Sequence, residues 1–202
     1  PASANITLTS KGQTAHAGRA FEKGVNAITA LISFIESLDL TYYEKNKYII
    51  NIGKIMGGNR ENIVPDFANC ELNVRFSQDE HLNKFCHHLK TKIDSFNATQ
   101  KALLSIKIES IRPAKPLTDR SIHFYSLLNK AIENCELAIK TEPSFGVCDG
   151  NFIASTGIPV IDTLGPVGTG MHTSKETIFL DSLEERIDLT CELISLFLDQ
   201  HK

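Results

Sequence analysis

The sequence predicts a mixed α/β protein with two parts: a β-α-β-β-α-β sandwich at residues 1–113 and a piece of an α/β domain at residues 114–202. Two observations predict this. Segments with the two-residue period of strands alternate with segments that have the apolar spacing of amphipathic helices. Arg112-Pro113-Ala114-Lys115-Pro116 then interrupts both patterns, because two prolines so close together prevent a helix and a central strand. We place the domain boundary there.

The first part contains four expected strands and two expected helices. The strands are expected at residues 5–9, 48–55, 70–76 and 103–108, and the helices at residues 25–38 and 77–93. Ser77 is the expected N-cap of the second helix, and residues 56–59 form a turn. This order is that of the ferredoxin-like split βαβ sandwich, in which two helices cover one face of a four-stranded antiparallel sheet.

The second part is poorer in strands. We expect a helix at residues 121–137, a short helix from Asn151, a buried strand at Pro159–Ile161 and a last helix capped by Asp181-Ser182. The apolar stripe of that last helix is expected to pack in the core; it consists of Leu183, Ile187, Cys191, Ile194 and Leu198. One strand and three helices do not complete a doubly wound sheet, so this part is expected to be a portion of a domain.

Composition narrows the classes of partner. The formal net charge is −3 and the apolar share is 42%, so no basic face points to nucleic acid or to an anionic membrane. Apolar runs stay well short of the roughly 20 residues that span a bilayer. Because the charge is nearly balanced, we expect small molecules as partners. Five cysteines, an odd number without a close pair, fit a reducing compartment, and we therefore expect a cytoplasmic protein.

Two loops contain candidate functional residues. In residues 164–173, glycines allow close approach of a ligand, and His172 follows an expected strand at a sheet edge, where open α/β sheets bind ligands. His172 is therefore a candidate zinc ligand, with an ordinary structural histidine as the alternative. A catalytic zinc needs about three protein ligands, and the sequence offers no spaced set to complete one. The second loop is Thr14-Ala15-His16-Ala17-Gly18.

These loops also carry a family resemblance. Residues 10–18 with Gly24-Val25-Asn26-Ala27 resemble the opening of the lid, or dimerisation, domain of M20 metallohydrolases. Residues 62–65, 72–76, 146–152 and 165–172 resemble later signatures of the family, in the right order. The most similar branch is the glutamate carboxypeptidase-like group, with acetylornithine deacetylase and succinyl-diaminopimelate desuccinylase as near relatives.

The resemblance implies a site with two zinc ions, or cobalt, whose bridging water attacks an amide carbonyl. His172 matches a metal ligand. His16 matches the lid histidine that stabilises the developing oxyanion, in several branches within the partner subunit's site. Asn62 and Arg75 match lid positions that meet the substrate, and Arg112 resembles an arginine of the carboxypeptidase branch, whose guanidinium suits a terminal carboxylate. An ordinary outward-facing strand charge is the alternative for Arg75.

Asp149 and Gly168 are further substrate-binding positions by the same resemblance. Cys148 departs from the family, where Ser or Thr is usual, which affects a hydrogen bond near the substrate. A larger departure is that the family's His-x-Asp and Glu-Glu metal-site motifs lie upstream of the lid and do not occur in these 202 residues.

Two functions of different classes follow. In the first, the chain is part of a hydrolase that cleaves an amide bond in an N-acyl amino acid or small peptide with a free carboxylate. The missing catalytic segment would complete this hydrolase. The second is a non-catalytic dimerisation or binding module, since exposed strand edges allow pairing. Both predict a homodimer through the lid. We expect the 202-residue chain alone to lack amidase activity and to bind zinc poorly. A third hypothesis makes Cys148 a nucleophile with His172 as its base. It is disfavoured because no third residue can be assigned that would orient the histidine.

Overall fold

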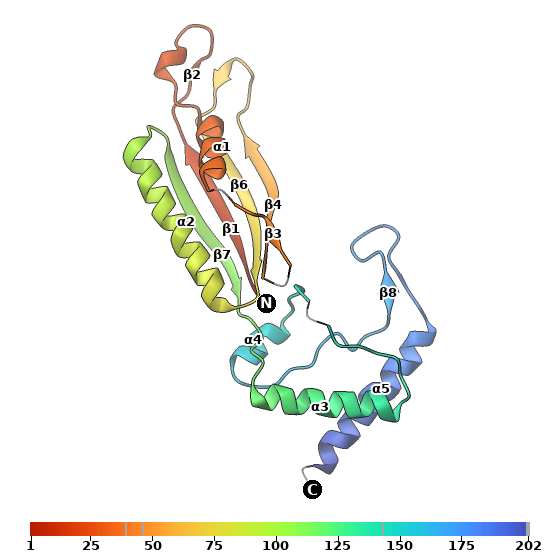
Figure 1. Ribbon diagram of the computed structural model, residues 1–202. Coiled ribbons are helices and arrows are strands. Elements are labelled where there is room, and N and C mark those ends of the chain that lie inside the picture. Colours follow the sequence, from red (N-terminus) through yellow and green to blue (C-terminus); the bar gives the residue numbers. More distant parts are fainter. Residues whose placement is uncertain (39, 46, 143, 201–202) are drawn as a thin grey trace. The chain divides into compact units, whose positions relative to one another are not determined.

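We describe the protein from a computed structural model, which covers residues 1–38, 40–45, 47–142 and 144–200 (Figure 1). Two compact units are present. The first unit consists of Pro1–Ala114 and Ser144–Cys148, and the second unit of Lys115–Pro143 and Asp149–Lys202. The short segment Ser144–Cys148 thus packs with the first unit, although the sequence analysis assigned it to the second part. Among the described residues, no helix is both long and apolar enough to cross a membrane.

The first unit is built on an antiparallel sheet of five strands in the order β3-β4-β6-β1-β7. Their bounds are Tyr43–Glu44 for β3, Tyr48–Gly57 for β4, Phe67–Phe76 for β6, Ala2–Lys11 for β1 and Leu103–Arg112 for β7. The predicted mixed α/β class and the β-α-β-β-α-β order are confirmed. The two-residue strand β3 is an addition that the sequence pattern did not indicate.

One face of this sheet forms the core. In β1, Ala4, Ile6 and Leu8 are buried, while the intervening positions are less so, as a two-residue period requires. Helices α1 (Ala27–Ser37) and α2 (Asp79–Thr99) cover this face (Figure 1). Their buried residues include Leu31 and Leu89, and each fully buried side chain of this kind contributes about 1.5–3 kcal/mol.

Element ends differ from the sequence prediction by a few residues. Helix α1 begins later than expected because Asn26 is its N-cap, accepting a hydrogen bond from the backbone of Thr29 at 3.0 Å. Helix α2 has Gln78 rather than Ser77 at its N-cap. It continues to Thr99 because Phe96 extends the apolar stripe and packs edge-to-face on Phe34.

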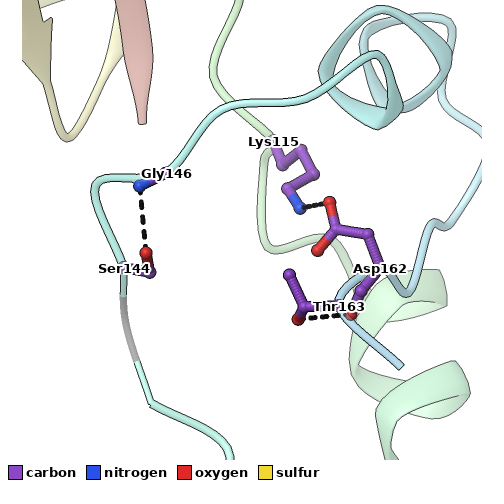
Figure 2. A network of polar contacts seen from close by, with 5 residues as sticks. All are labelled: Lys115, Ser144, Gly146, Asp162 and Thr163. Carbon is purple, nitrogen blue, oxygen red and sulfur yellow. Dashed lines mark hydrogen bonds and ion pairs between the residues drawn. The ribbon is translucent and has the colours of Figure 1, made fainter. Parts of the chain in front are cut away.

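The second unit is organised around two helices. Helices α3 (Asp119–Asn134) and α5 (Asp181–Asp199) bury a small core of Leu127, Leu128, Ala131, Ile132, Leu189 and Leu193. The remaining elements are α4 (Gly150–Ser155) and a hairpin of β8 (Gly168–Thr169) with β9 (Thr177–Ile178). An ion pair between Lys115 and Asp162, drawn in Figure 2, links the start of this unit to the segment before the hairpin.

Two predictions for the second unit are wrong. Pro159–Ile161 is irregular rather than a strand, because strand geometry needs a hydrogen-bonding neighbour and the described residues of this unit provide only the β8–β9 pair. The stripe of Leu183, Ile187, Cys191, Ile194 and Leu198 is exposed rather than buried. Helix α5 packs on α3 through a different stripe that contains Leu189 and Leu193. It therefore has apolar residues on two sides.

Candidate functional site

The loop that carries His16 is closed by backbone hydrogen bonds. Gln13 and Val25 exchange N–H···O bonds of 2.9 Å in both directions, which joins the two ends of the loop. Gly12 is required there, because a Cβ atom at this position would lie 1.9 Å from the carbonyl oxygen of Val25. The backbone N–H of Gly12 also donates to Asp66 at 2.8 Å. The loop is therefore fixed to the sheet at its base.

A second pairing brings His16 next to Asn62. Strand β2 (Ala15–His16) pairs with β5 (Ile63–Val64), with His16 opposite Ile63. The backbone N–H of Ala17 donates to the carbonyl oxygen of Asn62 at 3.0 Å. Two residues that were singled out separately in the sequence thus lie on neighbouring strands of one small ladder.

The His16 imidazole is exposed and oriented by its own loop. The backbone N–H of Gly18 donates to Nδ1 of His16 at 3.1 Å. An atom that accepts this bond carries no proton, so we assign the neutral ring the tautomer with its proton on Nε2. Nε2–H is then the hydrogen-bond donor of the ring, and a donor of this kind suits an oxyanion.

Two arginines lie at the other end of the sheet. Ser3 of β1 pairs with Arg75 of β6 on one side and with Arg112 of β7 on the other, so the three residues form one row across three strands. Arg75 donates from Nε to Oδ1 of Asn73 at 3.0 Å and from Nη1 to the carbonyl oxygen of Phe145 at 2.6 Å. The row places two guanidinium groups on the sheet face opposite the helices.

The structure does not bring all these residues together. His16 follows the end of β1 at Lys11, whereas the arginine row crosses β1 at Ser3, near its start. Ser3 and Lys11 are eight positions apart along the strand, which at about 3.3 Å per residue is roughly 26 Å. A small ligand at the arginine row of one chain is therefore out of reach of His16 of the same chain.

His172 lies in the β8–β9 hairpin of the second unit. It is exposed and has a φ of 64°, a left-handed conformation that is uncommon for a residue other than glycine. Its backbone N–H donates to Oε2 of Glu176 at 3.1 Å, and Thr173 closes a turn onto the carbonyl of Gly170. Gly168 is needed for the hairpin itself, because a Cβ atom there would lie 2.5 Å from the carbonyl oxygen of Thr177.

Asp149 is the N-cap residue of α4. Its side chain is exposed, and its carbonyl oxygen accepts from the backbone N–H of Phe152 at 3.0 Å. Cys148 precedes it and is half-buried. Asp149 therefore begins a short helix directly after the Ser144–Cys148 segment.

The described residues do not form a metal centre by themselves. Among residues 1–38, 40–45, 47–142 and 144–200, no three His, Cys, Asp or Glu side chains lie close enough together to hold a metal ion. In the hairpin, the Glu176 carboxylate accepts from the backbone of His172. A zinc centre that used His172 would need ligands from elsewhere.

Comparison with known proteins decides the family of the first unit. The sequence profile described as the peptidase dimerisation domain of M20 proteins matches residues 2–101. The first unit is an M20 peptidase dimerisation domain. The M20 chain is similar to carboxypeptidase G2 of Pseudomonas sp. (strain RS-16), with 28% identity over 94% of this chain and 45% of that protein.

Two solved structures show the same fold. Aminopeptidase PepT from Bacillus cereus matches with a TM-score of 0.80 and 25% identity over 96% of this chain and 52% of its own. The Bacillus subtilis YXEP protein, described as a dinuclear metal-binding peptidase of the M20 family, matches with a TM-score of 0.70 and 19% identity over 98% of this chain and 50% of its own. The chain thus spans about half the length of the relatives it matches.

Sequence reasoning assigned no role to three residues that shape these sites. Gly18 fixes the His16 tautomer, Ser3 sits between the two arginines, and Glu176 holds the backbone of His172. The first has a sequence signature, since a glycine two residues after an exposed histidine can donate its backbone N–H to the ring. The other two depend on strand register and on a side-chain conformation, which the sequence pattern does not define.

Proposed function

We propose that this chain is part of an M20-type amide hydrolase that acts on an N-acyl amino acid or a small peptide with a free carboxylate. The proposal assigns His16 to oxyanion stabilisation, His172 to one metal position, and Asn62, Arg112, Asp149 and Gly168 to substrate contacts. Two zinc ions, or cobalt, would activate water in the intact site. The relatives support this chemistry, because one is a carboxypeptidase, one an aminopeptidase and one a dinuclear metal-binding peptidase.

The geometry of His16 is the observation that carries the proposal. Its Nδ1 is occupied by the Gly18 N–H, and its ring is exposed on a loop fixed at both ends. A donor that is already oriented costs little reorganisation when negative charge develops on a carbonyl oxygen. A histidine of purely structural use would more commonly be packed or have both nitrogens engaged within the unit.

The distance along β1 supports a homodimer in which each active site uses two chains. His16 and Asn62 lie at one end of the sheet, and Arg112 lies at the other, roughly 26 Å away by strand rise. A substrate that meets both groups must meet them from different copies. The dimerisation-domain assignment of residues 2–101 agrees with this arrangement.

The edge of the sheet at β4 is our proposed dimer surface. Strand β3 pairs only with Tyr48 and Ile49, so within the described residues the later part of this edge faces outward. Ile55 is 53% exposed there. Ile28 of α1 lies over Gly57, and Ile32, one turn further along α1, is 46% exposed. An apolar edge of this kind suits pairing with a second copy.

The exposed apolar stripe of α5 supports the proposal that additional polypeptide of the intact protein covers this helix. Helices with apolar residues on several sides are typically buried within a larger core, and Ile187 of α5 is 60% exposed. Relatives about twice as long as this chain supply a source for such a core. The cysteine count continues to favour a reducing, cytoplasmic location.

The decisive experiment compares the intact protein with the 202-residue chain. After zinc or cobalt loading, we expect the intact protein to hydrolyse N-acyl amino acids or short peptides and to lose activity with a chelator. We expect the 202-residue chain to be inactive and to bind zinc weakly in a titration against a competing chelator. Stoichiometric tight binding by the short chain would contradict the assignment of His172 as one ligand among several.

The alternative is a non-catalytic dimerisation module, and the exposed β4 edge is the observation in its favour. Ile32→Asp and Ile55→Asp should produce a monomer in sedimentation experiments, with Lys107→Ala on the opposite edge as control. If the intact protein dimerises through this edge but shows no hydrolysis of any substrate in the panel, the module is the better assignment.

A further inference from the structure

Residues Ser144–Cys148 form a segment that we call the strap. The strap packs with the first unit, whereas the chain on both sides of it belongs to the second unit. Its anchoring contact is a hydrogen bond of 2.6 Å from Nη1 of Arg75 to the carbonyl oxygen of Phe145, between residues 70 positions apart. A charged donor makes this bond stronger than a neutral one.

The strap has a turn of its own that presents this carbonyl. The hydroxyl oxygen of Ser144 accepts from the backbone N–H of Gly146 at 2.9 Å, as Figure 2 shows. Such a side-chain turn replaces a backbone turn and leaves the carbonyl of the central residue available. The turn is tight, because a Cβ atom at Gly146 would lie 3.2 Å from the Ser144 hydroxyl oxygen.

Arg75 is itself held in place before it meets the strap. Its Nε donates to Oδ1 of Asn73, and Nδ2 of Asn73 donates to Oδ1 of Asn5 at 2.8 Å on the neighbouring strand. This chain of bonds runs across β1 and β6, two central strands of the sheet. Arg75 is half-buried, and the hydrogen bonds from Nε and Nη1 define the direction of its guanidinium.

The donors already in use indicate what Arg75 does. A carboxylate normally binds a guanidinium through two parallel N–H groups, and one of the two common forks includes Nε. Here Nε is bound to Asn73 and Nη1 to Phe145. A carboxylate that used the Nε fork would have to replace Asn73.

We propose that Arg75 is a positioning residue that anchors the strap to the sheet of the first unit. The anchored segment ends at Cys148, directly before Asp149 in the sequence. Anchoring differs from the substrate contact that the family resemblance implies for Arg75, and it does not depend on the proposed hydrolase activity.

The test is hydrogen exchange of the 202-residue chain, resolved to peptides. In Arg75→Gln, amides of the strap should exchange about 10-fold faster or more, because a charge-assisted hydrogen bond is lost. Arg75→Lys should rescue little, because a single ammonium nitrogen cannot reproduce the planar geometry in which Nε reaches Asn73 and Nη1 reaches Phe145. Peptides from β1 and β6 should exchange as in the parent chain, which separates anchoring from general destabilisation.

Two further variants make the test specific. Lys54→Gln changes a cation on the same face of the sheet, beside Glu71, and should leave exchange of the strap unchanged. Ser144→Ala removes the turn, and its effect on strap exchange should not add to that of Arg75→Gln, since both act on the Phe145 contact. Unchanged strap exchange in Arg75→Gln, or equal acceleration in Lys54→Gln, would overturn the proposal.

Discussion

The backbone N–H of Gly18 lies 3.1 Å from Nδ1 of His16 and donates to it. This short-range contact, between residues two positions apart, decides which ring nitrogen can act. With Nδ1 as an acceptor, the neutral ring has its single N–H at Nε2. The loop therefore supplies an oriented donor without help from another element.

In the hydrolase proposed above, substitution of His16 by alanine should lower kcat of the intact protein about 10²- to 10³-fold, because the proposed oxyanion donor is lost. The change in KM should be small if the ring acts in the transition state. Steady-state kinetics on the zinc-loaded protein measures both, with His87→Ala on the exposed face of α2 as control. A parallel rise in KM with unchanged kcat would place His16 in ground-state binding instead.

Substitution of Gly12 by alanine should open the His16 loop. A Cβ atom would collide with the carbonyl oxygen of Val25 at 1.9 Å, so the Gln13–Val25 pair must move. We expect a loss of roughly 2 kcal/mol or more in unfolding free energy, as for other backbone clashes. Chemical denaturation measures it. Gly53→Ala is the matched control, because the atoms nearest to its Cβ lie 3.7 Å away and no clash arises; equal losses would contradict this account.

The sheet of the first unit could be predicted because its strands alternate cleanly. Val74 and Phe76 are buried while Arg75 between them is less so, and that pattern alone assigns the two faces. Register could not be predicted to the same degree. Strand β4 has a bulge between Ile52 and Lys54, and which residue of one strand faces which residue of another depends on such local irregularities.

The second unit was predicted less well for a different reason. The period of α5 correctly indicated a helix, but the stripe singled out in the sequence is exposed, and a different stripe packs on α3. Pro159–Ile161 was expected to be a buried strand, but apolar character does not supply the neighbouring strand that pairing requires. Of the site residues, His16 and Asn62 are brought together by β2 and β5, which are too short to have a detectable period.

Alkaline conditions should destabilise the first unit through Cys70. Burial raises the pKa of the Cys70 thiol from 9.0 to about 11, with a smaller contribution from the charge of Glu71. The folded state thus favours the protonated thiol, so this stability is fully present below pH 9 and is lost as pH rises through about 11. The loss amounts to roughly 3 kcal/mol when the thiol is fully ionised.

Urea unfolding between pH 8 and pH 11, under reducing conditions, measures this dependence. The free energy of unfolding should fall less steeply with pH in Cys70→Ala than in the parent chain. Cys191→Ala changes an exposed thiol of the second unit and should leave the slope unchanged. Identical slopes in the parent chain and in Cys70→Ala would show that the buried thiol does not control alkaline stability.

The exposed stripe of α5 gives a prediction that compares two forms of the protein. In the 202-residue chain, the paired change Ile187→Ser and Ile194→Ser should leave the unfolding free energy nearly unchanged, because both side chains are more than half exposed. It should also reduce self-association and binding of an apolar dye. Leu189→Ala, on the buried stripe, should instead cost about 2–5 kcal/mol.

In the intact protein, the same paired change should become destabilising by several kcal/mol, because the stripe would then be covered by further chain and two buried apolar side chains would be lost. Thermal unfolding of the intact protein with and without the two substitutions provides the measurement. If the two substitutions leave the stability of both forms unchanged, the stripe stays at a surface in the intact protein. The second unit would then need no additional polypeptide to cover α5.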